Sequence, residues 1–330
     1  MIATAPGKVL LAGEYAVLHG HPAVVLAVDR RVVARIQEAQ AVLSPFLQAV
    51  RDQVAWRFGD GSVEARAAAR VVVDASSLER DGRKLGLGSS AAATVAAVAV
   101  AISKDSVETS PARRATQATI HAIAHAAHGA AQAPRGSRGS GADVAAATHG
   151  GVLLVARDPG APDGAPLAVT QLPWLRDAQM VLVWTGRPAD TPSLVAKVRA
   201  FQDGSPQRHA ELIAEIGAQA RALAAALFAG SDEAVITAIS EGAGAIRSLG
   251  SASSAPLVPP SLTAISELAR ELGGAAKPTG AGGGDLIVAI LPDPERAESF
   301  RGSVLARGLE VVPASVDPRG VELAPAVEKA

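Results

Sequence analysis

The chain has 330 residues, of which 48% are apolar, 19% are charged and none is cysteine. The apolar share is ample for a buried core and excludes a disordered chain, while the lack of cysteine excludes disulfides, thiolate-bound zinc and a thiol nucleophile. A formal net charge of −1 argues against a global attraction to nucleic acid or acidic membranes, but a local basic pocket stays open. At about 100 to 200 residues per domain, the length predicts two domains or one large one.

Apolar and β-branched runs alternate with helical patterns in the first half of the chain. The runs predict strands at residues 9–12, 23–28, 31–36, 70–73 and 152–156. The helical patterns predict helices at residues 43–56, 91–102 and 111–129 and a short helix from Asp143. The helix at 91–102 is uniformly apolar, so we expect it to be buried, with Ser89 and Ser90 in its first turn.

A segment rich in Pro, Gly and Asp, residues 158–166, is the predicted domain boundary. It divides the chain into residues 1–165 and residues 166–330. Beyond it, the patterns predict strands at 180–184, 286–291 and 309–315, and helices at 193–202, 207–229, 232–249, 260–272 and 294–308.

No targeting segment is predicted. The apolar run at residues 9–12 is interrupted by Gly13 and Glu14 and preceded by one cation, Lys8, so it does not fit a signal peptide. The longest apolar stretches, such as residues 91–102, are shorter than the roughly 18 to 20 residues of a membrane span. We expect a soluble cytoplasmic protein, monomeric or homodimeric, that binds a small-molecule substrate and neither nucleic acid nor membrane.

Residues 86–91 (Gly-Leu-Gly-Ser-Ser-Ala) are the first candidate binding segment. The glycines allow close approach of a ligand to the backbone, and the following helix presents free N–H groups and its positive dipole end, which suits a polyphosphate. The hydroxyls of Ser89 and Ser90 add donors and contacts for Mg²⁺. The segment also fits the dinucleotide pattern G-x-G-x-x-A, although no clear strand leads into it and no acidic residue ends a following strand. Phosphate binding, dinucleotide binding and a ligand-free helix cap stay open here.

Three further segments allow a functional and a structural interpretation. Residues 280–285 (Gly-Ala-Gly-Gly-Gly-Asp) indicate either a loop that must carry no side chains or an ordinary multi-glycine turn. Lys8 and Glu14, at a strand and its following turn, either face a site or form a solvated edge. Asp143 begins a helix, where an N-cap explains it as well as a chemical role does.

His121, His125 and His128 share one helix face, because they are spaced at i, i+4 and i+7. This spacing invites a metal site, but no H-E-x-x-H pattern and no carboxylate partner accompany the histidines. We expect a structural or surface role for them.

Together and in this order, the segments resemble the motifs of the GHMP kinase superfamily along nearly the whole chain. Its first motif is matched by residues 6–8 with 13–18, its second by 86–92 and its third by 277–285. The details are most similar to phosphomevalonate kinases: Tyr15 stands where mevalonate kinases usually carry His, and Lys84 precedes the glycine motif. Residues 184–193 are similar to the W-T-G-x-P-A-S-T-S segment of phosphomevalonate kinases, with Asp190 and Pro192 as departures.

The resemblance implies an α+β fold with a ribosomal protein S5 domain 2-like, ATP-binding N-terminal domain and a ferredoxin-like C-terminal domain. It implies ATP and Mg²⁺ as cofactors, catalytic roles for Lys8 and Asp143, and a metal contact for Ser90. The residues implied to bind ATP are Lys84, Gly86, Leu87, Gly88, Ser89, Ser90 and Ala91. The residues implied to bind the acceptor are Glu14, Tyr15, Ser140, Gly141, Arg187, Ser193, Thr279, Gly280, Ala281, Gly282 and Gly283.

The implied reaction is ATP-dependent phosphorylation of 5-phosphomevalonate to 5-diphosphomevalonate, a step of the mevalonate pathway of isoprenoid biosynthesis. A phosphate acceptor, with a second pKa of about 6, is largely anionic at pH 7 and needs positive charge more than a general base. Lys8, Lys84, Arg138 and Lys277 are among the cations that supply it. Mevalonate kinase is the alternative, because its alcohol acceptor must lose a proton and Asp143 matches the residue assigned to that task. Two alternatives remain. One is a diphosphomevalonate decarboxylase, although residues 13–15 do not resemble the first motif of that enzyme. The other is a non-catalytic sensor of small molecules.

Overall fold

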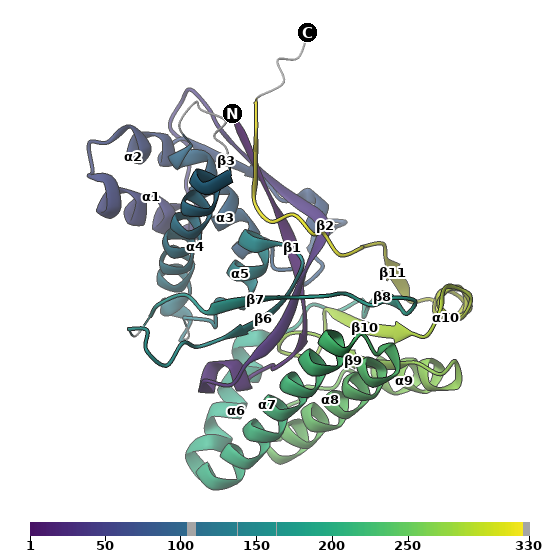
Figure 1. Cartoon of the computed structure of the whole chain (residues 1–330). Helices are drawn as coiled ribbons and strands as arrows, with labels where there is room; N and C mark the ends of the chain where they lie inside the picture. Colours follow the sequence, from purple (N-terminus) through teal and green to yellow (C-terminus); the bar gives the residue numbers. More distant parts are fainter. Residues whose placement is uncertain (104–109, 137, 163, 326–330) are drawn as a thin grey trace.

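The computed structural model describes the chain except for residues 104–109, 137, 163 and 326–330 (Figure 1). A six-stranded antiparallel sheet runs from the top of the molecule to below its middle in Figure 1. Its order is β12-β1-β2-β6-β7, with β3 paired to the outer half of β2. Its strands are β1 (Ile2–Ala12), β2 (Ala23–Ile36), β3 (Val71–Asp74), β6 (Val152–Ala156), β7 (Ala168–Leu172) and β12 (Glu322–Ala324).

Strand β2 is continuous, although two separate strands are predicted for its residues. The polar residues Asp29 and Arg30 form a bulge, because the pairing with β1 passes from Gly7 opposite Val28 to Pro6 opposite Arg31. The bulge bends the strand without ending it. Because its two residues are polar, the sequence pattern predicts a break between two strands at this point.

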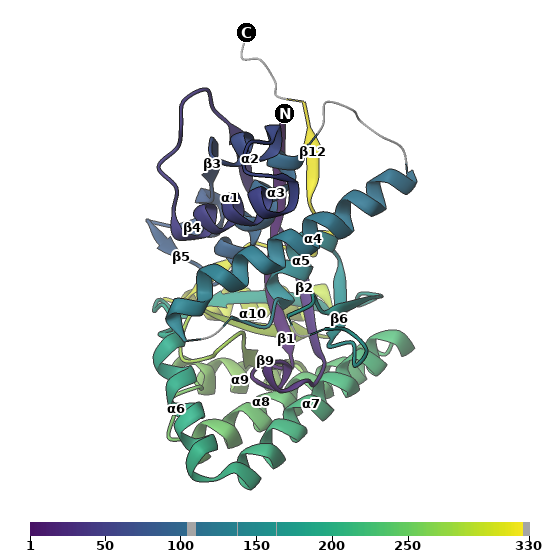
Figure 2. The ribbon, with the colours of Figure 1, turned by 90° about the vertical axis from the view of Figure 1, so that its left-hand side faces the viewer.

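Helices cover one face of this sheet (Figures 1 and 2). They are α1 (Pro45–Phe58), α2 (Val63–Ala68), α3 (Ser89–Ile102), α4 (Ser110–Gln132) and α5 (Ala142–His149). Helix α3 lies against β1 and β2, and ten of its 14 residues are buried because alanine and valine surround it on all sides. The predicted buried helix is therefore confirmed.

A second, four-stranded antiparallel sheet has the order β11-β8-β10-β9. Its strands are β8 (Gln179–Trp184), β9 (Ala275–Pro278), β10 (Leu286–Leu291) and β11 (Glu310–Val312). The accompanying helices are α6 (Thr191–Gly204), α7 (Pro206–Ala229), α8 (Asp232–Ala252), α9 (Ser261–Glu271) and α10 (Pro294–Ala306). Strand β10 is apolar throughout because Ile287 and Ala289 face the cluster made with α9 and α10, while Val288 and Ile290 face the main core.

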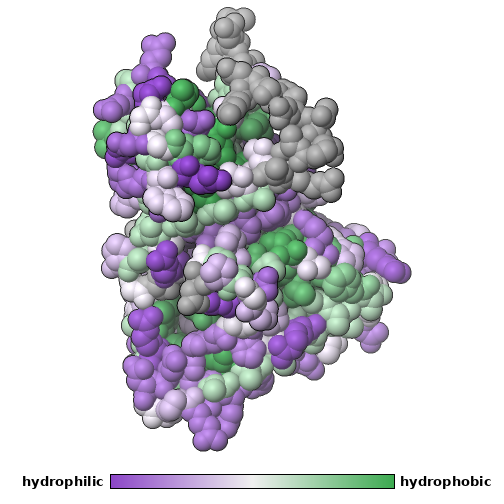
Figure 3. Space-filling model, turned by 60° about the vertical axis from the view of Figure 1, so that its left-hand side comes forward, coloured by the Kyte–Doolittle hydropathy of each residue, from purple (hydrophilic) through white to green (hydrophobic). Residues whose placement is uncertain are grey.

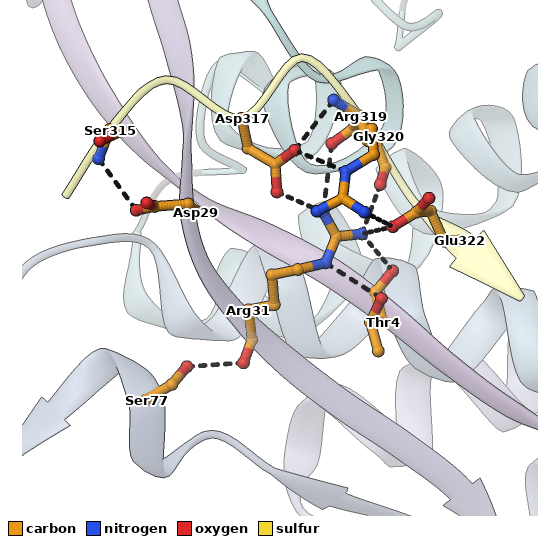
Figure 4. Close-up of polar contacts among 9 residues, drawn as sticks. All are labelled: Thr4, Asp29, Arg31, Ser77, Ser315, Asp317, Arg319, Gly320 and Glu322. Carbon is orange, nitrogen blue, oxygen red and sulfur yellow. Dashed lines mark hydrogen bonds and ion pairs between the residues drawn. The ribbon is translucent and has the colours of Figure 1, made fainter. Parts of the chain in front are cut away.

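The end of the chain returns to the first sheet (Figure 4). Arg31 on β2 donates to the Asp317 carboxylate at 2.5 Å and to the Gly320 carbonyl oxygen at 2.6 Å, and β12 then pairs with β1. Strand β7 also joins this sheet, through β6. Two strands that follow residue 165 thus belong to the N-terminal sheet, and the division at 165 stays a prediction. The predicted α+β class is confirmed.

Several short elements have no prediction in the sequence. They are α2, β7, β9, β12, the hairpin of β4 (Glu79–Arg80) and β5 (Arg83–Lys84), and the 3-10 turns at Ala16–His19, Ser76–Leu78 and Ala133–Arg135. The predicted strand at 309–315 is shorter in the structure, where β11 covers three residues.

Helix α7 corrects one expectation. Within the described residues, this helix of 24 residues is long and apolar enough to span a membrane by length and composition alone. Half of its apolar window is buried inside the molecule, where α7 packs along α8. Figure 3 shows a largely hydrophilic surface at the lower end of the molecule, where α6 and α7 lie in Figure 1. A buried core helix explains these observations.

Candidate active site

A cavity of about 550 Å³ collects residues from every candidate segment. The first residues of three helices line it: Ser89 and Ser90 of α3, Ala142 and Asp143 of α5, and Thr191 and Pro192 of α6. Strand β1 contributes Lys8, and the loop between β9 and β10 contributes Thr279, Gly280, Ala281 and Asp285. Because helix N-termini carry partial positive charge, three of them around one cavity with a lysine make it suitable for anions.

Lys8 lies at the junction of the two glycine-rich loops. Its backbone N–H donates to the Leu87 carbonyl oxygen at 2.8 Å, and its Nζ donates to the Gly86 carbonyl oxygen at 3.3 Å. A Cβ atom on Gly280 would lie 4.0 Å from the same Nζ. The ammonium group of Lys8 therefore lies between the two loops.

The loop before α3 has the conformation that its glycines predict. Gly86 and Gly88 have φ angles of +79° and +76°, in the left-handed region that favours glycine. A Cβ on Gly88 would lie 2.9 Å from Cγ of Lys8, so the absence of a side chain is what allows Lys8 to pass. Leu87 and Ala91 of the same segment are buried and do not line the cavity. They anchor the loop and the helix in the core.

The second glycine loop faces the cavity with only part of its length. Thr279, Gly280 and Ala281 line the cavity. Gly282 and Gly283 lie behind them, where added Cβ atoms would meet the Leu257 carbonyl oxygen at 2.2 Å and Leu194 at 2.8 Å. The first three residues are thus available to a ligand, and the two following glycines allow the loop to pack on its support.

Asp285 lines the cavity, and no role for it was predicted from the sequence. The Oδ1 atom of Asp285 accepts from the Ala189 N–H at 3.1 Å. A Cβ atom added to Gly86 would lie 2.5 Å from the Cβ of Asp285. The Asp285 side chain therefore lies between the loop before α6 and the glycine loop before α3. Burial raises the pKa of Asp285, while the Ala189 amide and the nearby Lys8 oppose that shift. Its position at the end of the third glycine motif is the signal that could have identified it.

Tyr15 and Glu14 connect the first motif to the third. Tyr15 has a φ of +62°, and its hydroxyl donates to the Ala281 carbonyl oxygen at 2.8 Å. Burial, and secondarily the charge of Glu14, raise the pKa of the Tyr15 phenol, so it stays protonated as a donor. Glu14 lines the cavity and forms a buried ion pair with Lys277 of β9. The charge of Lys277 is therefore balanced by Glu14 within the protein. The sequence, in contrast, predicts that Lys277 supplies positive charge to the acceptor.

Asp143 lies in the first turn of α5, whose N-cap is Gly141 and not Asp143 itself. The Asp143 side chain is 24% exposed and lines the cavity, while one of its oxygens accepts from the Val144 N–H at 2.9 Å. Ser140 also lines the cavity, and its hydroxyl accepts from the Ala142 N–H at 3.2 Å. Gly141 supplies the left-handed turn, with a φ of +83°.

Arg187 and Ser193 do not line the cavity. The side chains are exposed, and their backbones have structural roles: the Arg187 carbonyl oxygen accepts from the Asp285 N–H, and the Ser193 N–H donates to the Asp190 carboxylate. Asp190, a departure from the family's segment, is the N-cap of α6. The segment contributes Pro188, Ala189, Thr191 and Pro192 to the cavity instead.

Two cationic side chains border a recess of about 470 Å³ that adjoins this cavity. Arg199 of α6 lines both, and Arg138 lines the recess together with His19 and Gln202. Arg199 donates to the Gly136 carbonyl oxygen at 3.1 Å, which ties α6 to the loop before α5. Arg199 and Gln132, which also lines the cavity, were not predicted, because only the packing of distant helices brings them to it.

The residues around the cavity fit a magnesium-bound triphosphate. The left-handed turn at Gly86 and Gly88 and the start of α3 offer backbone N–H groups to phosphate oxygens. The hydroxyl of Ser90 and the carboxylate of Asp143 are hard oxygen ligands of the kind that Mg²⁺ prefers, and both line the same cavity.

The histidines on α4 form no metal site. No group of three or more His, Asp or Glu side chains in the described part of the chain has an arrangement that could hold a metal ion. His121 is buried and lies 3.1 Å from His149 of α5, ring nitrogen to ring nitrogen. His128, in contrast, lies against two cavity residues, Ser90 and Asp143. The expectation that no carboxylate accompanies these histidines is therefore wrong.

Comparisons with known proteins relate the chain to a family of kinases. Residues 223–309 match the family described as GHMP kinases C terminal. The chain is 32% identical to a phosphomevalonate kinase of Streptomyces sp. strain CL190, over 87% of this chain and 88% of that one. It is 25% identical to a mevalonate kinase of Thermococcus sibiricus, over 94% and 95% of the two chains. A Streptococcus pneumoniae phosphomevalonate kinase, solved in complex with phosphomevalonate and AMPPNP, superposes with a TM-score of 0.76 at 18% identity, covering 96% of this chain and 99% of that one.

The fold and the cavity define a kinase of the GHMP class, an enzyme that transfers a phosphoryl group. Since a relative at 32% identity covers most of both sequences, the chain belongs to the phosphomevalonate kinase family.

Proposed function

We propose that this kinase transfers the γ-phosphoryl group of ATP to the phosphate of 5-phosphomevalonate, giving 5-diphosphomevalonate and ADP. The observation that carries the proposal is the convergence of three helix N-termini and Lys8 on one cavity. Such an array stabilises negative charge, which is the main requirement when two phosphate groups must approach each other.

The transfer is a direct in-line displacement. An oxygen of the acceptor phosphate forms a bond to the γ-phosphorus while the bond from that phosphorus to the β–γ bridging oxygen breaks, and ADP leaves. Lys8, Gly86, Gly88, Ser89 and Ser90 hold the triphosphate in this proposal, and Lys84 adds charge at the cavity edge. Mg²⁺, held by Ser90 and Asp143, would supply further neutralisation of the phosphates.

The acceptor occupies the side of the cavity bounded by Tyr15 and the 279–281 loop. Two arginines support this placement of the acceptor. Arg199 lines both the cavity and the adjoining recess, and Arg138 lines the recess. Two guanidinium groups suit the carboxylate at the far end of phosphomevalonate from its phosphate, because arginine binds carboxylates through paired donors.

Mevalonate kinase activity is the second candidate, and a specific observation favours it. The carboxylate of Asp143 lines the cavity and is partly exposed, so it is available as a base for an alcohol. In our first proposal the same carboxylate binds Mg²⁺ and no base is needed, because the acceptor phosphate is already an anion.

ADP release with phosphomevalonate, mevalonate and homoserine as separate acceptors tests the proposal. We expect turnover with phosphomevalonate that exceeds turnover with the other two by at least about 100-fold, since one well-placed charged contact is worth roughly 3 kcal/mol. Faster turnover with mevalonate would overturn the proposal in favour of the second candidate. Binding of ATP without ADP release for any acceptor would indicate a non-catalytic sensor. Omission of Mg²⁺, with EDTA present, should abolish turnover.

A further inference from the structure

His128 of α4 lies directly behind the cavity. Its side chain is 2% exposed, and it does not line the cavity itself. Its Nε2 lies 3.2 Å from the hydroxyl oxygen of Ser90 and 3.9 Å from a carboxylate oxygen of Asp143. The imidazole stacks on the ring of Phe46 from α1, with the ring centroids 5.2 Å apart. One buried ring thus contacts two groups that face the cavity from two different helices.

This contact restricts the Ser90 hydroxyl. A serine side chain on the surface of a cavity rotates among staggered positions, and a hydrogen bond to a buried, stacked ring selects one of them. The negative charge of Asp143 favours the imidazole tautomer with its proton on Nε2, since a lone pair there would face the carboxylate. Nε2–H then donates to Ser90, and the hydroxyl keeps its own proton and a lone pair for partners in the cavity.

We propose that His128 is a positioning residue for phosphoryl transfer. It fixes the Ser90 hydroxyl at the start of α3 relative to the Asp143 carboxylate at the start of α5. The inference rests on the proposed function, because it assumes that these two groups face the phosphates and Mg²⁺. Residues that hold such ligands from behind commonly affect metal affinity or activity by about 10- to 100-fold.

The same helix offers a matched control. His121 lies two turns before His128 on α4, is also buried at 6% exposure, and is paired with His149 instead of a cavity residue. Replacement of either histidine by phenylalanine keeps a ring of similar size and removes the nitrogen atoms. Only the His128 change removes a contact to the cavity.

The experiment compares His128→Phe and His121→Phe in steady-state kinetics and in thermal unfolding. We expect His128→Phe to lower kcat by about 10- to 100-fold with KM for ATP and for the acceptor changed less than about 3-fold, while His121→Phe keeps kcat within about 2-fold. In a Ser90→Ala background, His128→Phe should cause less than about a 3-fold further loss, because the residue it positions is already gone. Equal kcat values for the two phenylalanine variants, or fully additive losses with Ser90→Ala, would overturn the proposal.

A second pair of variants applies if His128→Phe does not fold. His128→Gln places an amide near the position of Nε2 and should restore most of kcat, whereas the shorter His128→Asn places its amide near Nδ1 and should not. Equal activity of these two variants would overturn the proposal. All variants are assayed with whichever acceptor supports ADP release by the unchanged enzyme. A failure of phosphomevalonate as acceptor would therefore overturn the proposed function without affecting this comparison.

Discussion

The ammonium group of Lys277 and the carboxylate of Glu14 form an ion pair across the two sheets, with the side chains only 1% and 2% exposed. Lys277 lies on β9, and Glu14 lies in the turn after β1, so the pair joins the first motif to the third. Lys277 also donates to the Pro278 carbonyl oxygen at 2.9 Å. The pair holds the two sides of the cavity together and leaves little of the Lys277 charge for a ligand.

Removal of one partner of this pair should destabilise the protein strongly. Lys277→Met or Glu14→Gln alone leaves a buried group without its partner, and we expect a loss of about 3 to 5 kcal/mol in the free energy of unfolding. The double change Lys277→Met with Glu14→Gln should cost less than the sum of the two, because no charge is then left unpaired. Urea unfolding measures all three variants. Losses below about 1 kcal/mol in the single variants would contradict the burial of the pair.

Lys8 should contribute to turnover and little to folding. Lys8→Met keeps an unbranched side chain that is one atom shorter but removes the charge between the two glycine loops, and we expect kcat to fall by about 100- to 1,000-fold. The unfolding midpoint should change little, because the hydrogen bond of Nζ to Gly86 is long, at 3.3 Å. Lys197→Met, on an exposed part of α6 outside both cavities, is the control and should keep its turnover. Near-normal kcat for Lys8→Met would remove Lys8 from the mechanism.

Buried histidines should make the protein less stable in mild acid. Burial, and secondarily the neighbours His149 and His125, lower the pKa of His121 to about 3, and burial lowers the pKa values of His125 and His149 as well. In the unfolded chain these histidines bind protons near pH 6.5, whereas in the folded protein they stay neutral to lower pH. The free energy of unfolding is therefore highest above pH 6.5 and falls as the pH decreases from about 6.5 toward 3. Each such histidine lowers the free energy of unfolding by up to about 1.4 kcal/mol for each pH unit in this range.

Chemical unfolding at pH 7.5, 6.0 and 5.0 measures this loss. His121→Phe should reduce the slope of stability against pH between 6.0 and 5.0, because its side chain takes up no proton in either state. An unchanged slope would show that His121 is accessible to protons in the folded protein.

The local chemistry of the sequence predicts much of this site, and packing decides the rest. The glycines at 86 and 88, Lys8 and the 280–285 loop each carry a signal within a few residues, and the structure brings residues from all of them to one cavity. The contact of His128 with Ser90 joins residues 38 apart in the chain, and no local pattern encodes it. Strand β7 was missed because it is an edge strand with mostly exposed or partly buried residues, so its sequence shows little alternation.

The contact between Arg31 and Asp317 should secure the end of the chain (Figure 4). Burial alone would raise the pKa of Asp317, but the Arg319 N–H and the Arg31 guanidinium outweigh it and hold the pKa below its usual value. Asp317→Asn removes one of the two carboxylates paired with the mostly buried Arg31, since Glu322 also lies 3.4 Å from the guanidinium. We expect a loss of about 1.5 to 3 kcal/mol in the free energy of unfolding, the usual range for a hydrogen bond to a charged group. Limited proteolysis should then cut the segment after β11 faster than in the unchanged protein. Equal cleavage rates would show that β12 pairing alone holds the segment.

Gly88→Ala separates backbone strain from the approach of Lys8. A Cβ atom at this position would lie 2.9 Å from Cγ of Lys8. The alanine backbone would also have to adopt the left-handed region, because the φ angle of Gly88 is +76°. Gly308→Ala is a matched control, because its φ is +71° and a Cβ there would meet nothing within 4 Å. Both changes should cost about 1 to 2 kcal/mol in stability from backbone strain. Only Gly88→Ala should lower kcat and raise KM for ATP, since it displaces Lys8 and narrows the loop. If the two variants retain equal activity, the close contact of Gly88 with Lys8 has no part in catalysis.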